Sequence, residues 1–325
     1  MELKTIKSLF NTRVYRIPAY QRGYAWQNKK KTEESKKESD KVGQLKDLWN
    51  DILQIPTGGW HYTGMLTLAK IPADETGLLR GNEFRNIVDG QQRITSILIL
   101  IATLNKIALK EYAHNLEIRE GDVEHTYLYK KNDVAAACLF GYEKDNPSDK
   151  FFRKHILELD EVEDESSESI YTENLLEAKR FFTSEIQKYL NKEVDKIEAL
   201  QKLYDTIVNC LKFNEYTLPD ELDEHVVFET MNNRGRALSE LEKLKNRLMY
   251  LNEKLHLVLS LDSERSTALN SQKKDLANNI NTAWITVYKS LGMNKDYPLD
   301  DEEFLKNHWI VYFDAYNRSE ANVYQ

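Results

Sequence analysis

Four polar residues with the potential for phosphate chemistry stand together in IVDGQQRITSILILIATL (87–104), where a strand-like run gives way to a helix-like run: Asp89, Gln91, Gln92 and Arg93. Asp89 is suited to be the helix N-cap, and Gly90 allows a tight turn. The free N–H groups of a helix start attract anions, and Arg93 adds a cation that is unfavourable for the helix dipole but favourable for a phosphate. The segment therefore predicts a phosphate site. The alternative is a polar turn in which Arg93 meets a surface carboxylate.

A second stretch of similar character is YRIPAYQRGYAW, residues 15–26. Gln21 and Arg22 are predicted to lie in a loop among Tyr20, Tyr24 and Trp26. The aromatic rings are able to stack on a base while the guanidinium binds a phosphate. Ordinary packing of the aromatic rings is the alternative.

A third stretch, VFETMNNRGRALSELEKLKN (227–246), leads into a helix. Asn232 and Arg234 precede that helix and could face an anion, with a polar turn as the alternative. Ser239 and Glu242 have the spacing of a capping box, which predicts a structural role for Glu242.

The elements that must position these residues follow from hydrophobic spacing. The first third predicts a strand near 14–17, an amphipathic helix within 42–55, strands at 62–68 and 84–88, and the helix that opens at 91. Beyond residue 105 strand signals thin out, and four segments carry apolar residues at helical spacing. We therefore predict an α+β protein: an α/β unit over residues 1–130, then a mostly helical region over 131–325 that contributes the third stretch.

Composition narrows the class of protein. The chain has 325 residues, 41% of them apolar, and a net charge of −8, which argues against non-specific coating of nucleic acid. Residues 1–30 nevertheless hold seven basic side chains against one acid, Glu2, and such a basic segment either receives phosphates or is simply solvated. Cys138 and Cys210 are too far apart in sequence for a zinc or redox motif, so we expect inert thiols. Neither a signal peptide nor a membrane span is indicated, and we expect a cytoplasmic protein without a membrane partner.

Together the three stretches resemble the GmrS-like N-terminal domain of GmrSD-type, modification-dependent (type IV) restriction endonucleases and related phage-defence proteins. The matching segments are IPAYQRGYAW (17–26), YTGMLTLA (62–69), IVDGQQRITSI (87–97), VFETMNNRGRALSELEKLKN (227–246) and, more weakly, DEEFLKNHW (301–309). Where that family usually has Asp before Lys-Leu-Lys-Asn, this chain has Glu242, which keeps a capping carboxylate.

The resemblance implies a ParB/sulfiredoxin-like fold that binds and hydrolyses a nucleoside triphosphate with a divalent metal, most simply Mg²⁺. It implies catalytic roles in the Asp-Gly-Gln-Gln-Arg segment, for Asp89, Gln91, Gln92 and Arg93. It also implies that Asp89 is the metal ligand, and that a wider set binds the nucleotide and its phosphates: Gln21, Arg22, Gly90, Asn232 and Arg234. The roles are chemically reasonable, because phosphoryl transfer needs positioned donors, cations and an oriented water.

Proteins of this kind commonly continue into an HNH nuclease domain. The seven histidines here are scattered, and we expect the HNH domain to be absent from this chain, which ends at Gln325. The expected partners are therefore a nucleotide, DNA that carries a modification, and a nuclease domain or subunit, with a homo-oligomer also possible.

Three functions remain open from the sequence. The first is a nucleotide-hydrolysing sensor that controls a nuclease. The second is a non-catalytic module that binds a nucleotide or modified DNA. Direct DNA cleavage by this chain is the least expected, because clustered carboxylates are missing from the motif segments. The preferred nucleotide and the DNA modification are not specified by the sequence.

Overall fold

The computed structural model describes residues 2–27, 43–72, 77–116, 123–133, 135–143, 147–159, 169–232, 238–255, 263–293 and 299–313. Its strands are β1 (Glu2–Thr5), β2 (Arg13–Ile17), β3 (His61–Lys70), β4 (Glu83–Asp89), β5 (Tyr129–Lys131), β6 (Ala136–Cys138), β7 (Phe140–Tyr142) and β8 (Leu211–Thr217). Its α-helices are α1 (Ile6–Leu9), α2 (Gln44–Leu53), α3 (Gln91–Tyr112), α4 (Pro147–Phe151), α5 (Ile170–Leu190), α6 (Lys196–Cys210), α7 (Glu224–Asn232), α8 (Glu240–Lys254), α9 (Ser263–Leu291) and α10 (Asp301–Tyr312). Short 3-10 or π turns are η2 (Gly77–Leu79), η3 (Glu124–Leu128) and η4 (Phe152–Ile156).

A six-stranded mixed sheet forms the body, in the order β1-β8-β3-β4-β2-β7. β2 runs parallel to β4 and β7, β3 runs antiparallel to β4 and parallel to β8, and β1 runs antiparallel to β8. Mostly helical elements follow, so the predicted mixed α/β architecture with a helical second part is confirmed. Membership of the ParB/sulfiredoxin-like superfamily stays a prediction.

The sheet spans the predicted boundary at residue 130. β7 and β8 come from the region expected to be helical, and β8 lies between β1 and β3. Pairing with distant partners, and not a local pattern alone, makes 211–217 a strand. The boundary at 130 therefore falls inside one hydrogen-bonded sheet.

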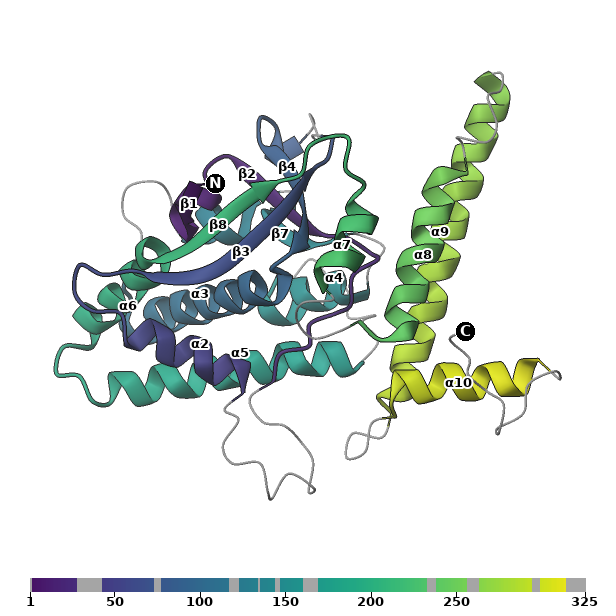
Figure 1. Ribbon diagram of the computed structural model, residues 1–325. Helices are drawn as coiled ribbons and strands as arrows, with labels where there is room; N and C mark the ends of the chain where they lie inside the picture. The colour runs from purple at the N-terminus through teal and green to yellow at the C-terminus, as the bar shows by residue number, and fades with distance from the viewer. Residues whose placement is uncertain are drawn as a thin grey trace.

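A layer of helices covers one face of this sheet, with α2, α3 and α5 side by side beneath it (Figure 1). The central helix is α3, whose residues Ile97–Ile101 are fully buried. A helix surrounded on all sides by protein needs apolar residues on all sides, and the run ILILI meets that need. Within the described ranges, no helix is long and apolar enough to cross a bilayer.

The start of α3 differs from the prediction. Gly90, and not Asp89, is the N-cap, and its side chain cannot form a capping bond. Asp89 still belongs to β4 and pairs with Thr67 of β3. The chain therefore turns one residue later, at Gly90, whose φ of 97° is the left-handed conformation that favours glycine.

Beside this body, α8 and α9 lie along one another and α10 crosses near their lower end (Figure 1). These helices share a small apolar cluster of their own, formed by Leu241, Ile280, Trp284 and Leu305. The predicted capping box at the start of α8 is confirmed, because the Ser239 hydroxyl accepts from the Glu242 N–H and the Glu242 carboxylate accepts from the Ser239 N–H.

Candidate anion-binding site

Arg93 is used to bind backbone carbonyl groups. Its Nη1 donates to the Thr63 carbonyl and its Nη2 to the Met65 carbonyl, each at 2.9 Å. These carbonyls flank Gly64, where the register of β3 against β8 shifts at a bulge. β4 pairs with β3 only from Thr67 onward, so these two carbonyls have no ladder partner on β4, and Arg93 supplies their donors. Asp89 lies 3.5 Å from the same guanidinium. The position of an arginine in the first turn of α3 thus has a structural explanation.

Gln91 and Gln92 form hydrogen bonds to the backbone of the loop at residues 22–25. Gln91 Nε2 donates to the carbonyl of Arg22, and Gln92 Nε2 to the carbonyl of Gly23, both at 3.1 Å. Gln92 also accepts from the N–H of Ala25 at 2.8 Å. The first turn of α3 therefore fixes the backbone of residues 22–25, and the two predicted polar stretches form one structural unit.

The side chains of the loop take different positions. Gln21 is buried and donates to the carbonyls of Ile87 and Val88 on β4. Tyr24 is buried in the main core, and Trp26 packs partly buried against it. The Tyr24 hydroxyl bonds to Ser96 at 2.6 Å.

Tyr20 is also buried, and its ring packs on His225 and Phe228 with centroids 4.3 Å and 5.0 Å apart. These contacts give Tyr20 and Tyr24 packing roles. Trp26 is the most accessible of the three predicted stacking residues, although it too rests on the core.

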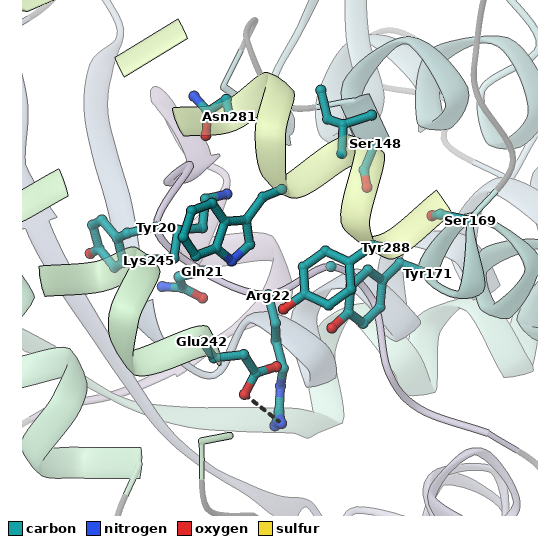
Figure 2. A pocket seen from close by; sticks show the side chains of 13 residues that line it. Tyr20, Gln21, Arg22, Ser148, Ser169, Tyr171, Glu242, Lys245, Asn281 and Tyr288 are labelled. Atoms are coloured by element: carbon teal, nitrogen blue, oxygen red, sulfur yellow. Dashed lines mark ion pairs between the residues drawn. The ribbon is translucent and has the colours of Figure 1, made fainter. Parts of the chain in front are cut away.

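A cavity opens where this loop meets the start of α5, α8 and α9 (Figure 2). It is lined by Tyr20, Gln21, Arg22, Gly23, Ser148, Ser169, Tyr171, Glu242, Lys245, Asn281, Trp284, Ile285 and Tyr288. Two of the three predicted stretches meet here. They contribute lining residues within 20–23 and 242–245, which are more than 200 residues apart in sequence. Gly23 has a steric reason to be glycine, because a Cβ there would lie 2.4 Å from the Tyr171 ring.

Two cations face this cavity. The Arg22 side chain is 12% exposed, and its nearest acidic partner is Glu242, with Nη1 3.9 Å from the carboxylate (Figure 2). That distance is beyond a hydrogen bond, and the guanidinium donates to no other acceptor in the described part of the chain. Lys245 likewise has no hydrogen-bonding partner there, and burial lowers the pKa of its ammonium group to about 8. The residues that line the cavity carry these two cations against one carboxylate, Glu242, and the Glu143 carboxylate also acts on Lys245.

The cavity walls hold several polar atoms without partners. They are Tyr20 Oη, Gln21 Oε1, Asn281 Oδ1 and Trp284 Nε1, all on side chains no more than 9% exposed. A buried polar atom without a hydrogen bond costs free energy, and native proteins rarely leave several in one place unless water or a ligand satisfies them. The concentration of such atoms therefore identifies this cavity as a candidate binding site.

The remaining predicted residues lie outside the cavity. Asp89, Gln91, Gln92 and Arg93 stand behind the loop and do not line it. Asn232 is the last residue of α7, and its side chain, like the whole of Arg234, lies outside the described residues.

Sequence reasoning found Tyr20, Gln21 and Arg22 but missed Lys245, Tyr171 and the α9 residues. The one sequence signal for these missed residues was the charge of Lys245, which lies within a predicted helix whose buried face is formed by leucines.

Three basic residues of the N-terminal segment have partners within the body. On β8, Glu215 accepts from Lys4 at 3.3 Å and from Arg13 at 2.6 Å. Arg16 donates to the carbonyl of Cys138 at 2.9 Å. Burial raises the pKa of the Cys138 thiol to about 11, which keeps it protonated near neutral pH. Of the basic residues described before 27, Arg22 is the one that faces the cavity.

Comparison with known families gives one match that covers most of the chain. Residues 6–249 match the family described as the N-terminal domain of GmrSD restriction endonucleases. The matched range includes the loop at 20–23, the first turn of α3 and Lys245, whereas α9 begins beyond it. No curated protein matches the chain.

Proposed function

Because the chain belongs to the family of GmrSD restriction endonuclease N-terminal domains, we propose that it is the nucleotide-binding regulatory part of a DNA restriction or phage-defence system. In this proposal the chain binds and hydrolyses a nucleoside triphosphate, and its nucleotide state controls a nuclease domain or subunit that acts on modified DNA. The chain itself does not cut DNA.

The observation that carries the proposal is the guanidinium of Arg22, which has an ion pair with Glu242 but no hydrogen bond in the described residues. Arginine is the side chain best suited to bind phosphate oxygens with two parallel hydrogen bonds. Arg22 is nearly buried, has no hydrogen-bonding partner in the described residues, and faces a cavity with a second cation, Lys245. A phosphate supplies the hydrogen-bond acceptors that the guanidinium lacks.

In this proposal the Asp-Gly-Gln-Gln-Arg segment lies behind the loop that presents Arg22 and supports it. Gln91 and Gln92 hold the loop that presents Arg22, and Arg93 fixes β3 to α3. Asp89, 33% exposed at the side chain, is the member of the segment most able to orient a water molecule. In hydrolysis that water attacks the terminal phosphorus, the bond to the bridging oxygen breaks, and a nucleoside diphosphate and inorganic phosphate leave.

A divalent ion fits this site only as an ion shared with the nucleotide. Within the described ranges, no group of three or more potential metal ligands is found. Mg²⁺ is commonly held by one or two carboxylates together with substrate phosphates, so Asp89 would be the protein ligand. When bound, the ion would neutralise charge on the phosphate oxygens.

A second candidate function is nucleotide binding without turnover. It is favoured by the hydrogen bonds of Gln91, Gln92 and Arg93, which are all made to backbone groups and leave few free groups for catalysis. Binding with no phosphate release would select this function.

The test is a nucleotide panel, with Mg²⁺ and with a chelator, that measures both binding by calorimetry and phosphate release. We expect Arg22→Met to weaken nucleotide binding by at least about tenfold, because a charge-assisted hydrogen bond to the phosphate is lost. Arg180→Met is the matched control, since Arg180 is 68% exposed and pairs with Glu173 on the surface. Asp89→Asn should lower phosphate release with little effect on affinity.

Failure of the wild-type chain to bind any nucleotide would overturn the proposal. Gln91→Leu should weaken binding through the loop, and its effect should be lost in the Arg22→Met background, because both substitutions act on the same guanidinium.

A further inference from the structure

We infer that a second pocket, between the end of β3 and the start of α7, binds an aliphatic cation, that is, an ammonium or guanidinium group on a hydrocarbon stem. Glu224 is its main ligand and Glu253 the second. The inference goes beyond the proposed function and does not depend on it, because this pocket shares no lining residue with the cavity at Arg22.

The pocket lies where the chain passes from β8 into α7, beside the last residues of β3 (Figure 1). Its free volume is about 330 Å³, which is in the range of pockets that hold small molecules. Part of its wall is apolar and is formed by Ala69, Ile71, Leu218, Pro219 and Leu222. Such a surface accommodates the hydrocarbon part of a ligand.

Carboxylates form the polar part of the wall. Four of them line the pocket: Asp220, Asp223, Glu224 and Glu253. Asp223 is paired with Lys254 at 2.6 Å, and the exposed Lys70 is the basic residue among the described lining. Three carboxylates therefore remain against one lysine, and this excess of negative charge attracts a cation.

Glu224 has the surroundings of a carboxylate that lacks a cationic partner within hydrogen-bond distance. Its two oxygens accept from Nδ2 of Asn86, a neutral donor, at 3.2 and 3.3 Å. Burial raises the pKa of Glu224 to about 7, although Asn86 and His225 act in the opposite direction. The carboxylates of Glu253 and Glu143 act in the same direction as burial. A cationic group bound against Glu224 would compensate for both effects.

The described groups around Glu224 offer more acceptors than donors. Asn86 is 4% exposed, and its Oδ1 has no hydrogen-bond partner in the described part of the chain. Glu253 lies close to Glu224, because its Oε1 is 3.4 Å from Nε2 of His225, the next residue of α7. Ammonium and guanidinium groups carry several N–H donors and no acceptor, so both match this excess.

Other classes of ligand fit this pocket less well. An anion would be repelled by the carboxylates, and a neutral ligand would leave them without a counter-charge. Mg²⁺ and Ca²⁺ need several oxygen ligands, whereas no group of three or more potential metal ligands occurs in the described residues. The cationic group can belong to a free amine or to a lysine or arginine side chain of a protein, since the chemistry of recognition is the same.

The experiment measures binding of putrescine, agmatine and a capped lysine peptide with neutral flanking residues to the full chain by calorimetry. Butanediol is the neutral analogue of putrescine. Glu224→Gln and Glu253→Gln each remove one negative charge from the wall with little change of shape. The matched control is Glu221→Gln, because Glu221 is exposed in the loop between β8 and α7 but does not line the pocket.

We expect each pocket variant to weaken binding of the cations by about tenfold or more. Glu221→Gln should bind like wild type, and butanediol should not bind. Unchanged thermal unfolding of Glu224→Gln checks that this variant is folded.

The outcomes distinguish the source of the cation. Binding of putrescine or agmatine that is lost in Glu224→Gln supports a site for a free amine or guanidine. Binding of the peptide alone, lost in the same variant, supports a site for a protein side chain. Binding of none of the cations by wild type overturns the inference, and so does equal weakening by Glu221→Gln or binding of butanediol as tight as that of putrescine. None of these results depends on nucleotide binding, so the proposed function stands or fails separately.

Discussion

At the scale of single residues, the charge state of Lys245 is the feature with the clearest consequence. An ammonium group in a cavity loses hydration, which destabilises its charged form, and the Glu143 carboxylate offsets this loss only in part for Lys245. A phosphate bound in this cavity reverses the effect, because it supplies an acceptor. Ligand affinity and the protonation of Lys245 are therefore linked.

The linkage predicts that the affinity for sulfate, a phosphate analogue, falls as pH rises from 7 to 9. The pKa of Lys245, lowered by burial to about 8, means that the group is charged below that pH and neutral above it. Sulfate does not titrate in this range, and a pKa near 8 predicts a loss of about tenfold by pH 9. Calorimetry between pH 7 and 9 measures this loss of sulfate affinity. Lys245→Met should abolish the pH dependence, whereas Lys243→Met should leave it unchanged.

The contributions of the other titrating groups around Lys245 to the pH dependence can be distinguished from that of Lys245. Burial raises the pKa of Tyr20 and Tyr288 well above 10, so both stay neutral up to pH 9. Burial shifts the pKa of Tyr171 in the same direction. The charged groups nearby are Glu143, which acts on Lys245, and Arg22, Glu242 and Asp301, which act on Tyr171.

Behind Tyr20, burial raises the pKa of Glu224 to about 7. In His225, hydrogen bonds to Glu253 and Asn246 outweigh burial and also raise the pKa. A pH dependence that persists in Lys245→Met would come from this pair and would contradict the assignment to Lys245.

At the scale of elements, the contact between β3 and the first turn of α3 depends on Gly64. Its φ is 114°, and a Cβ at this position would lie 1.7 Å from Arg93 Nη1. The bulge, the glycine and the arginine thus form one arrangement in which a side chain replaces missing sheet hydrogen bonds.

Gly64→Ala is therefore expected to lower the free energy of unfolding by about 2 to 4 kcal/mol, the sum of backbone strain and a displaced guanidinium. Gly58→Ala is the matched control, since Gly58 also has a positive φ, 77°, but has open space around it. Its expected cost is about 1 kcal/mol of strain alone. Urea unfolding compares the two, and equal losses would show that Arg93 does not matter to β3.

The same elements explain what the sequence could and could not predict. Strands β2, β3 and β4, the long helices and the capping box at Ser239 follow from local spacing, which is why they were predictable, whereas β8 depends on distant partners and was not. Arg93 appeared to be a phosphate ligand because its partners, the carbonyls of Thr63 and Met65 on β3, cannot be found from the local pattern around residue 93. Lys245 and Trp284 sit at helical spacing among apolar residues, and the cavity that gives them meaning arises only when distant segments meet.

At the scale of the whole molecule, the described chain has a large core beneath the sheet and a smaller cluster in α8 to α10. Regions with fewer buried apolar contacts open more readily to solvent. We expect α9 to exchange its amide hydrogens faster than α3, which is buried on nearly all sides.

Addition of phosphate or nucleotide should slow exchange in residues 280–288 and in the 20–23 loop together, with α3 unchanged. Hydrogen exchange followed by mass spectrometry provides the measurement, and Arg22→Met should remove the effect. Protection of the loop without protection of α9 would show that the ligand does not connect the two parts.

The position of β8 in the sheet has a consequence for synthesis. β1 has β8 as its sheet neighbour, and one edge of β3 is also completed by β8. As the chain emerges from the ribosome, both strands must wait until residues 211–217 have been translated. Until then the nascent chain exposes an unpaired strand edge, a known starting point for aggregation. Expression of this protein should therefore depend on chaperones that hold the first 210 residues until the sheet can close.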